Sequence, residues 1–423
     1  MKLLFAATPL TGHLNPLLAI ARLAAERGDD IVMTCTEPFR ARIEKAGFRF
    51  LPYVSKGNPE YRDTDLPAGP ERYRHEFERR FLDGMPDQAQ TLRDLIAAER
   101  PDAIVAGSLF LGVLPLLLGD GERPPIVLCN VSFLFHDRPD HAPVGFGLPP
   151  AADAAEGERY AAMAAQVDAG FTNPVRAYAD ALLAKEGLPG LPASLPHSIV
   201  ILPDAFAQFT VPSFEYDYGA LPPHVRFVGA LPPPVGTMPL PEWWDEIDGH
   251  RRVVLVTQGT LANQNFDELI EPTLSALADR DDLLVIATTG GRPLESLRAP
   301  LPRNARVSTF LPFGDLLPKV DVFVTNGGYG SVSMALEAGV PIVSAGVTED
   351  KAEIGARIAW AGVGLNLAAS EPTREALHET IATVLDEPRF RERAAEMARE
   401  FARYDTRREI LGLIDGVRPR KTG

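Results

Sequence analysis

The sequence predicts an α/β protein made of two doubly wound, parallel-sheet domains in tandem. Short apolar runs alternate with helical patterns in the first part of the chain, and the alternation restarts after a stretch rich in proline and glycine. Strand–helix alternation of this kind implies a parallel sheet with helices on both faces. The length of 423 residues agrees with two domains, because single cores stop growing at roughly 250–300 residues.

The first alternation begins at the N-terminus. Residues 14–27 carry apolar side chains at helical spacing, and Gly28 ends the predicted helix. A second helix is predicted at residues 39–46. The apolar runs that predict strands are residues 2–7, 31–35, 103–106 and 126–130.

An interdomain linker is predicted where residues 221–223 and 231–241 concentrate proline and glycine, because proline resists both helix and sheet. Strands are then expected at residues 252–257, 283–288, 320–325 and 341–345, and helices at 267–278, 331–338, 353–360 and 374–415. The expected divisions are an N-terminal domain (1–215), a linker (216–250), a C-terminal domain (251–390) and a terminal helical segment (391–423).

Composition excludes several classes of protein. The formal net charge of −15 argues against nucleic acid as a partner, although a site on an acidic protein can be locally positive. Cys35 and Cys129 form neither a disulfide framework nor a metal cluster, which favours a reducing cytoplasm. No stretch approaches the roughly 20 apolar residues of a membrane span. We therefore expect a cytoplasmic protein with no metal and no membrane partner.

A glycine-rich turn in the C-terminal half is the first candidate site. The strand ending at Thr325 is followed by Asn326-Gly327-Gly328-Tyr329-Gly330, and a helix is expected to begin near Ser331. Small residues let a ligand approach the backbone, and the N–H groups and partial positive charge of a helix start suit a diphosphate. Alone, such a turn is equally compatible with a purely structural connection.

The motifs around this turn resemble those of the family-1 glycosyltransferases, which have the GT-B fold. The motifs are Thr11-Gly12-His13-Leu14-Asn15-Pro16, Val256-Thr257-Gln258-Gly259-Thr260, Phe310-Leu311-Pro312-Phe313, Thr325-Asn326-Gly327-Gly328-Tyr329-Gly330-Ser331, Gly339-Val340-Pro341, Asp350-Lys351 and Gly362-Val363-Gly364. The resemblance implies two facing Rossmann-like domains, a C-terminal helix that returns to the N-terminal domain, and hexosyl transfer from a nucleotide-diphosphate sugar without a metal.

The resemblance also implies roles at the donor site. Phe310 would stack on the nucleotide base, and Asp350 would accept hydrogen bonds from sugar hydroxyls. Thr260 would lie near the phosphates from the side opposite the glycine turn. The complete implied set of donor-binding residues is Thr260, Phe310, Asn326, Gly328, Gly330, Ser331, Asp350 and Lys351.

Three residues depart from the family pattern. Asn326 replaces a histidine that stabilises the leaving diphosphate, and an amide carries no charge. Met334 replaces a glutamate that binds the ribose. Lys351 replaces a glutamine; it can favour a charged sugar, reach the phosphate, or pair with Glu349 or Glu353. The donor nucleotide therefore stays open between UDP and dTDP.

His13 is the implied general base that takes the proton of the acceptor hydroxyl. In many relatives an aspartate orients this histidine, but Gly107 occupies that position here, with Ser108 beside it. Either His13 acts alone or with a substitute partner, giving slower transfer to easily ionised phenols, or the protein is impaired or does not use base catalysis.

The acceptor is expected to bind two long loops of the N-terminal half, residues 55–85 and 132–160. Phe133, Phe135 and Phe146 suggest an apolar or phenolic small molecule, although packing beneath the loops explains these aromatics equally well. We expect a monomer or a loose homodimer.

The leading hypothesis is an inverting glycosyltransferase. A sugar-nucleotide epimerase of the same fold and a non-catalytic nucleotide-sugar-binding or partner-activating protein remain alternatives. A dinucleotide oxidoreductase is disfavoured, because no Gly-x-Gly-x-x-Gly follows the first strand.

Overall fold

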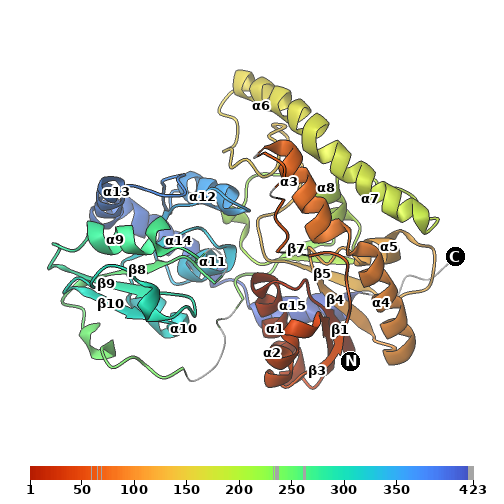
Figure 1. The fold of residues 1–423 in the computed structure, drawn as a ribbon, viewed down its shortest axis with the longest axis horizontal. Coiled ribbons are helices and arrows are strands. Elements are labelled where there is room, and N and C mark those ends of the chain that lie inside the picture. Colours follow the sequence, from red (N-terminus) through yellow and green to blue (C-terminus); the bar gives the residue numbers. More distant parts are fainter. Residues whose placement is uncertain are drawn as a thin grey trace.

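The computed structural model describes residues 1–58, 60–63, 65–67, 69–231, 233, 238–260 and 263–417, and it contains two parallel sheets. Each sheet is covered by helices, and the two layered domains lie beside each other (Figure 1). This confirms the predicted fold class. Within the described part of the chain, no helix has the length and apolar character needed to span a membrane.

The N-terminal sheet has seven strands in the order β3-β2-β1-β4-β5-β6-β7. Its strands are β1 (Lys2–Ala6), β2 (Asp30–Cys35), β3 (Arg49–Pro52), β4 (Ala103–Gly107), β5 (Ile126–Asn130), β6 (Ala205–Gln208) and β7 (Val225–Phe227). The order reverses between β1 and β4. In sheets of this type, the crevice at such a reversal is the usual ligand site.

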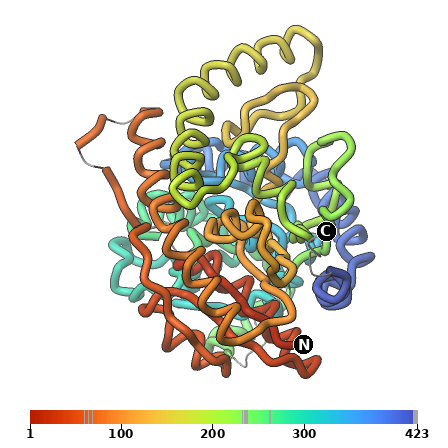
Figure 2. The backbone as a smooth tube through the Cα atoms, turned by 90° about the vertical axis from the view of Figure 1, so that its right-hand side faces the viewer, coloured from red at the N-terminus to blue at the C-terminus, as the bar shows by residue number. Residues whose placement is uncertain are grey.

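Both faces of this sheet are buried. Leu4 and Ala6 of β1 enter one apolar core, while Leu3 and Phe5 enter the other, because successive side chains of a strand point to opposite faces. The helices of this domain are α1 (Thr11–Glu26), α2 (Arg40–Lys45), α3 (Pro70–Phe77), α4 (Met85–Glu99), α5 (Val113–Leu118), α6 (Ala154–Val167), α7 (Asn173–Lys185) and α8 (Leu195–Ile201). Helices α6 and α7 rise above the body of the molecule (Figures 1 and 2).

The C-terminal sheet repeats this plan with the order β10-β9-β8-β11-β12-β13. Its strands are β8 (Arg252–Thr257), β9 (Leu283–Thr288), β10 (Ala305–Ser308), β11 (Val322–Thr325), β12 (Ile342–Ser344) and β13 (Gly364–Asn366). The helices that follow β8 are α9 (Ile270–Ala276), α10 (Phe313–Leu316), α11 (Tyr329–Glu337), α12 (Lys351–Trp360), α13 (Arg374–Asp386), α14 (Pro388–Phe401) and α15 (Thr406–Gly416). Here the order reverses between β8 and β11, so α11 begins at the second switch point.

The N-terminal sheet extends past residue 215, where the linker was expected to begin. Strand β7 pairs with β6. Tyr216 and Tyr218, which lie in the segment that connects these two strands, are buried. A three-residue edge strand is compatible with the flanking prolines, because an edge can leave backbone groups unpaired. Of the proline-rich stretch predicted as linker, residues 232 and 234–237 lie outside the described residues.

The helical region predicted from residue 374 to about 415 consists of three helices, α13, α14 and α15. Helix α14 stays on the C-terminal domain, where Met397 and Phe401 join its core. Helix α15 packs on α1 and β6 through Ile410, Leu411 and Ile414. The predicted return of a C-terminal helix to the N-terminal domain is therefore confirmed.

The chain crosses between the domains twice, and the two crossings touch. At Gly229 the backbone has φ of 81°, and a Cβ atom there would lie 2.8 Å from the Cβ of Tyr404 and 2.7 Å from the Oγ1 of Thr406. Glycine is required at this position by both the positive φ and the close approach.

Candidate donor and acceptor site

The predicted diphosphate turn lies at the carboxyl end of β11. Gly327 has φ of 92°, which lets the chain turn sharply into α11, and Gly328 is the residue that precedes the helix. The first turn of α11 contains no acidic side chain. A Cβ atom at Gly330 would meet nothing within 4 Å, so the surface over the helix start is open. The arrangement offers backbone N–H groups and a partial positive charge to an anion.

Two side chains of this turn already have partners. The Asn326 amide donates from Nδ2 to the backbone carbonyl of Gln258 at 2.8 Å, which ties the turn to the loop after β8. The Ser331 hydroxyl donates to the carbonyl of Gly328 at 2.8 Å. Asn326 therefore holds the shape of the turn, and it brings no positive charge to the place where the family commonly has histidine.

Phe310 and Thr260 lie at the same edge of the C-terminal sheet, after β10 and β8. The Phe310 side chain is 51% exposed, and its ring lies against Gly291. A Cβ atom at Gly291 would be 2.6 Å from Cζ of Phe310, so this glycine makes room for the ring. Thr260 is exposed and follows Gly259, whose carbonyl accepts a hydrogen bond from Asn263 at 3.1 Å.

Asp350 immediately precedes α12 and reaches the N-terminal domain. Its Oδ2 accepts a hydrogen bond from the Ser132 hydroxyl at 2.6 Å. Burial raises the pKa of Asp350, while the hydrogen bond from Ser132 opposes that change. The carboxylate thus has one oxygen engaged across the domain boundary.

Lys351 is buried beside Asp350 and pairs locally. Its Nζ lies 3.2 Å from Oε2 of Glu349 and 3.1 Å from Oγ1 of Thr348. Of the options left open by the sequence, the structure thus shows the pairing with Glu349. The charge of Lys351 is offset before any ligand arrives.

His13 is the third residue of α1, at the switch point of the N-terminal sheet. Its Nδ1 is buried and has no hydrogen-bond partner among the described residues. Desolvation lowers the pKa of His13 to about 4, with Glu349 opposing the shift and Arg80 adding to it. The ring is consequently neutral at pH 7.

The position of the missing carboxylate, at Gly107, is buried and lies against Leu17. A Cβ atom on Gly107 would have Cδ1 of Leu17 as its nearest neighbour, at an ordinary contact distance of 3.7 Å. Ser108, the suggested substitute partner, donates its hydroxyl proton to Oδ1 of Asn130 at 2.9 Å instead. Ser108 therefore does not serve His13 in this structure.

The three acceptor-side aromatics occupy different environments. Phe133 is buried in the core that joins the domains, with the Phe135 ring edge-on at 4.9 Å and the Arg357 guanidinium 4.9 Å from its centroid. Phe135 is half-buried, whereas Phe146 is 46% exposed. Phe133 thus occupies the packed position that the sequence left as an alternative, and Phe146 is the ring most accessible to a ligand.

No sequence pattern predicts the buried polar contacts between the domains. Ser132, Gln208 and Glu215 of the N-terminal domain contact Asp350, Tyr329 and Arg357 of the C-terminal domain. These partners are separated by more than 100 residues in sequence. No local pattern connects such residues, so only the fold could reveal them.

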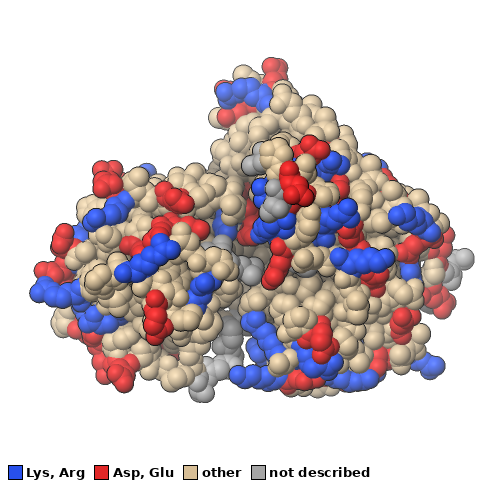
Figure 3. Space-filling view, viewed as in Figure 1, with Lys and Arg blue, Asp and Glu red and all other residues tan. Residues whose placement is uncertain are grey.

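A groove separates the two domains in the space-filling view, and Lys and Arg side chains border it over α1 and α2 (Figure 3). Arg42 of α2 hydrogen-bonds to Asn15 and Thr11 at the start of α1 rather than to a carboxylate. Desolvation and the nearby Arg22 lower the pKa of Arg42. An acidic protein thus carries locally positive groups on α2, next to the start of α1.

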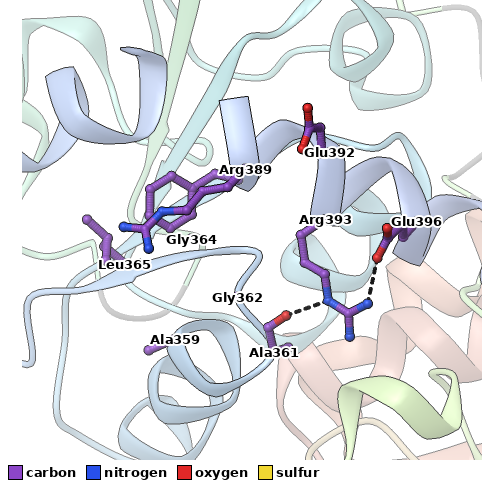
Figure 4. Close-up of a pocket in the computed structure, with 10 residues that line it drawn as sticks. Ala359, Ala361, Gly362, Gly364, Leu365, Arg389, Glu392, Arg393 and Glu396 are labelled. Atoms are coloured by element: carbon purple, nitrogen blue, oxygen red, sulfur yellow. Dashed lines mark hydrogen bonds and ion pairs between the residues drawn. The ribbon is translucent and has the colours of Figure 1, made fainter. Parts of the chain in front are cut away.

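A separate pocket of about 420 Å³ lies between the end of α12 and α14. Arg393 extends across it, donating to the carbonyl of Ala361 at 2.9 Å and to Glu396 at 2.7 Å (Figure 4). The pocket shares no lining residue with the predicted donor or acceptor groups. No group of three or more His, Cys, Asp or Glu residues suited to a metal occurs in the part of the chain that the structure describes.

Comparison with known proteins finds relatives along nearly the whole chain. Residues 271–415 match the family described as erythromycin biosynthesis protein CIII-like, C-terminal domain. The chain is 36% identical to 4'-demethylrebeccamycin synthase of Lentzea aerocolonigenes, over 98% of this chain and 99% of that protein. It is 33% identical to UDP-glycosyltransferase 2 of Phaeomoniella chlamydospora, over 97% and 94%.

Solved structures show the same fold. The glycotransferase of kitacinnamycin superposes with a TM-score of 0.73 at 22% identity, covering 98% of both chains. The spinosyn rhamnosyltransferase SpnG, solved with thymidine diphosphate, gives a TM-score of 0.70 at 20% identity, covering 98% of this chain and 100% of that one. With relatives above 30% identity along nearly their whole length, the chain belongs to the family-1 glycosyltransferases of the natural-product type, which have the GT-B fold.

Proposed function

We propose that this enzyme transfers a sugar, with inversion, from a UDP- or dTDP-linked donor to a hydroxyl of a small apolar or phenolic natural product. The observation that carries the proposal is the set of groups at the carboxyl edge of the C-terminal sheet: exposed Phe310, the open start of α11, and Asp350. His13 lies at the corresponding edge of the other domain. The relatives named as a rebeccamycin synthase and as UDP-glycosyltransferases support this substrate class.

Donor binding is assigned to the C-terminal domain. The exposed face of Phe310 stacks on the base, and the N–H groups at Gly328 and Gly330 hold the diphosphate at the start of α11. The other oxygen of Asp350 accepts a hydrogen bond from a sugar hydroxyl. Leaving-group charge is stabilised mainly by the helix start, because Asn326 is neutral and occupied with Gln258.

Proton removal is assigned to His13. With Nδ1 buried, Nε2 is the ring nitrogen left for the acceptor hydroxyl. The acceptor oxygen attacks C1 of the sugar, its proton passes to Nε2, and the bond from C1 to the diphosphate oxygen breaks. No carboxylate stabilises the resulting imidazolium at Nδ1, so the proton moves more easily from an acidic phenol than from an alcohol. Each unit of pKa mismatch costs about 1.4 kcal/mol.

The first experiment measures which nucleotide the protein binds and whether it transfers the sugar. UDP-glucose, dTDP-glucose and GDP-mannose are compared by thermal shift, since a ligand specific to the native state raises its melting temperature. Product formation is then followed with a phenolic acceptor, and the anomeric configuration of the product is determined by NMR. Retention of configuration would exclude the single-displacement mechanism.

The same assay tests a second function. Asn326, Gly107 and the low pKa of His13 each weaken the support for catalysis of sugar transfer. In that case the chain binds a nucleotide sugar without turning it over and acts on a partner protein. Acceptor-dependent release of nucleoside diphosphate excludes this reading. An epimerase would instead release an isomerised sugar nucleotide in the absence of any acceptor.

We also propose that the enzyme works in the cytoplasm as a monomer or loose homodimer, without a metal and without nucleic acid. Transfer that persists in EDTA supports the metal-free part of this proposal. Loss of transfer on chelation, restored by a divalent cation, would refute it.

A further inference from the structure

A buried ion-pair cluster joins the two domains next to the proposed active site. Arg357 of α12 donates from Nε to Oε2 of Glu215 at 2.8 Å, from Nη1 to Oε2 of Glu353 at 2.5 Å, and from Nη2 to the Tyr218 hydroxyl at 2.7 Å. Arg357, Glu215 and Glu353 are all almost fully buried. Glu215 and Tyr218 belong to the N-terminal domain, so Arg357 connects the domains through charge-assisted hydrogen bonds.

The second oxygen of Glu215 contacts the other parts of the site. Oε1 accepts from the Tyr329 hydroxyl at 3.2 Å, from the backbone N–H of Leu134 at 3.2 Å and from Nε2 of Gln208 at 3.3 Å. Tyr329 is the first residue of α11, between Gly328 and Gly330. Leu134 lies in the predicted acceptor loop. One carboxylate thus contacts the start of the diphosphate helix, the acceptor loop and, through Arg357, helix α12.

Helix α12 is held to the N-terminal domain at three successive positions. Asp350, which precedes it, accepts from Ser132; Glu353 accepts from the backbone N–H of Gly145 at 2.7 Å; and Arg357 binds Glu215. The spacing of three and then four residues places these side chains on one face of the helix. The face that carries the sugar-binding candidate Asp350 is therefore the face fixed by Glu215.

The energetics favour a role in geometry over one in stability. A buried ion pair is often no more stabilising than apolar residues of similar volume, because both charges lose their hydration. Such a pair does impose one arrangement on the groups that it joins. The cluster here contains one arginine and two glutamates, and burial raises the pKa of Glu215 while the charge of Arg357 opposes that change.

We infer that Glu215 is a positioning residue for the transfer reaction: it aligns the starts of α11 and α12 with the acceptor loop. The acceptor oxygen is thereby aimed at C1 of the bound sugar in preference to water. Misplacement of reacting groups by about 1 Å costs roughly 100-fold in rate. This inference rests on the proposed transferase function.

The test is Glu215→Gln, which keeps the shape and part of the hydrogen bonding but removes the charge that binds Arg357. The kcat of transfer is expected to fall about 10- to 100-fold. The dissociation constant of the donor nucleotide should change less than about threefold, because Glu215 contacts the buried side chain of Tyr329, whereas the diphosphate is proposed to bind the backbone N–H groups at Gly328 and Gly330. The share of donor lost to hydrolysis, relative to transfer, should rise.

Asp204→Asn is the matched control. Asp204 pairs with Arg123 at 2.5 Å inside the N-terminal domain, at the amino end of β5 and away from the site. This variant should lose stability with an unchanged ratio of hydrolysis to transfer. If Glu215→Gln does not fold, Tyr329→Phe tests the same alignment, since it deletes one hydroxyl donor to Glu215; the ratio should again rise, by a smaller factor.

The inference is overturned if the folded Glu215→Gln or Tyr329→Phe protein keeps both the kcat and the hydrolysis-to-transfer ratio of the wild type. It is also overturned if Asp204→Asn raises that ratio equally. Failure of the proposed function looks different, because the wild-type protein itself would then show neither transfer nor donor hydrolysis.

Discussion

The two domains place their proposed functional groups at equivalent structural positions, but the two positions are not equally complete. After β11, the turn into α11 is closed by hydrogen bonds from Asn326 and Ser331, and its surface is open to a ligand. After β1, the turn into α1 leaves Nδ1 of His13 and the hydroxyl of Thr8 buried without partners among the described residues. The comparison indicates that the proposed donor site is well formed, whereas the proposed base lacks hydrogen-bonded support.

The largest effect is expected from removing that base. His13→Ala should lower the kcat of transfer by about 100- to 10,000-fold, the range that general-base catalysis supplies. Donor affinity, measured by calorimetry, should be retained because His13 lies in the opposite domain. His378→Ala, which changes an exposed histidine of α13, is the control. Near-normal turnover of His13→Ala would mean that His13 is not the base.

The donor side can be weakened through its aromatic platform. Phe310→Ala should cost about 1–3 kcal/mol of donor binding, which is the usual value of base–aromatic stacking. Gly291→Ala should act in the same direction, because its Cβ would lie 2.6 Å from the Phe310 ring. Calorimetric titration with the nucleoside diphosphate measures both, and Leu294→Ala provides a control at a nearby exposed apolar side chain. Unchanged affinity in Phe310→Ala would show that the base binds elsewhere.

Gly107→Asp should supply the carboxylate partner that His13 lacks in the turn after β1. With the neutral ring of His13 as the proposed base, wild-type activity should fall only as the pH drops through about 4. A carboxylate beside the ring favours the imidazolium and raises this pKa, which moves the acidic limb of the kcat/KM profile to higher pH. Transfer to alcohols should gain up to about tenfold per unit of pKa.

The control for that experiment is Gly107→Asn, which has the same shape without the charge. An Asp variant whose pH profile and alcohol activity match those of the Asn variant would show that the missing charge does not limit the reaction.

The smallest effect is expected at Lys351, since Glu349 already offsets its charge. Lys351→Gln should change the KM for a neutral sugar donor less than about threefold, in line with the small net value of a partly exposed ion pair. A selective loss of activity with a uronic-acid donor, measured beside the glucose donor, would instead assign Lys351 to the sugar.

The sequence predicted the fold class because alternating strands and helices are local patterns, and the donor turn because its residues are consecutive. The domain boundaries were harder to predict from the sequence. Strand β7 is three residues long, and a short edge strand among prolines has no clear sequence signature. The burial of Phe133 was equally hidden, since an aromatic residue in a loop can face a ligand or the core. The contacts of Ser132 and Glu215 depend on how two separate domains meet, which no motif records.

The close contact between Gly229 and Tyr404 has a mechanical consequence. Because the two covalent connections between the domains touch at Gly229 and Tyr404, the domains are anchored to each other at this contact. The second connection, after α14, leads into α15, whose Ile410 and Ile414 cover apolar surface of the N-terminal domain. Cutting the chain between α14 and α15 would thus leave one covalent connection between the domains in place of two.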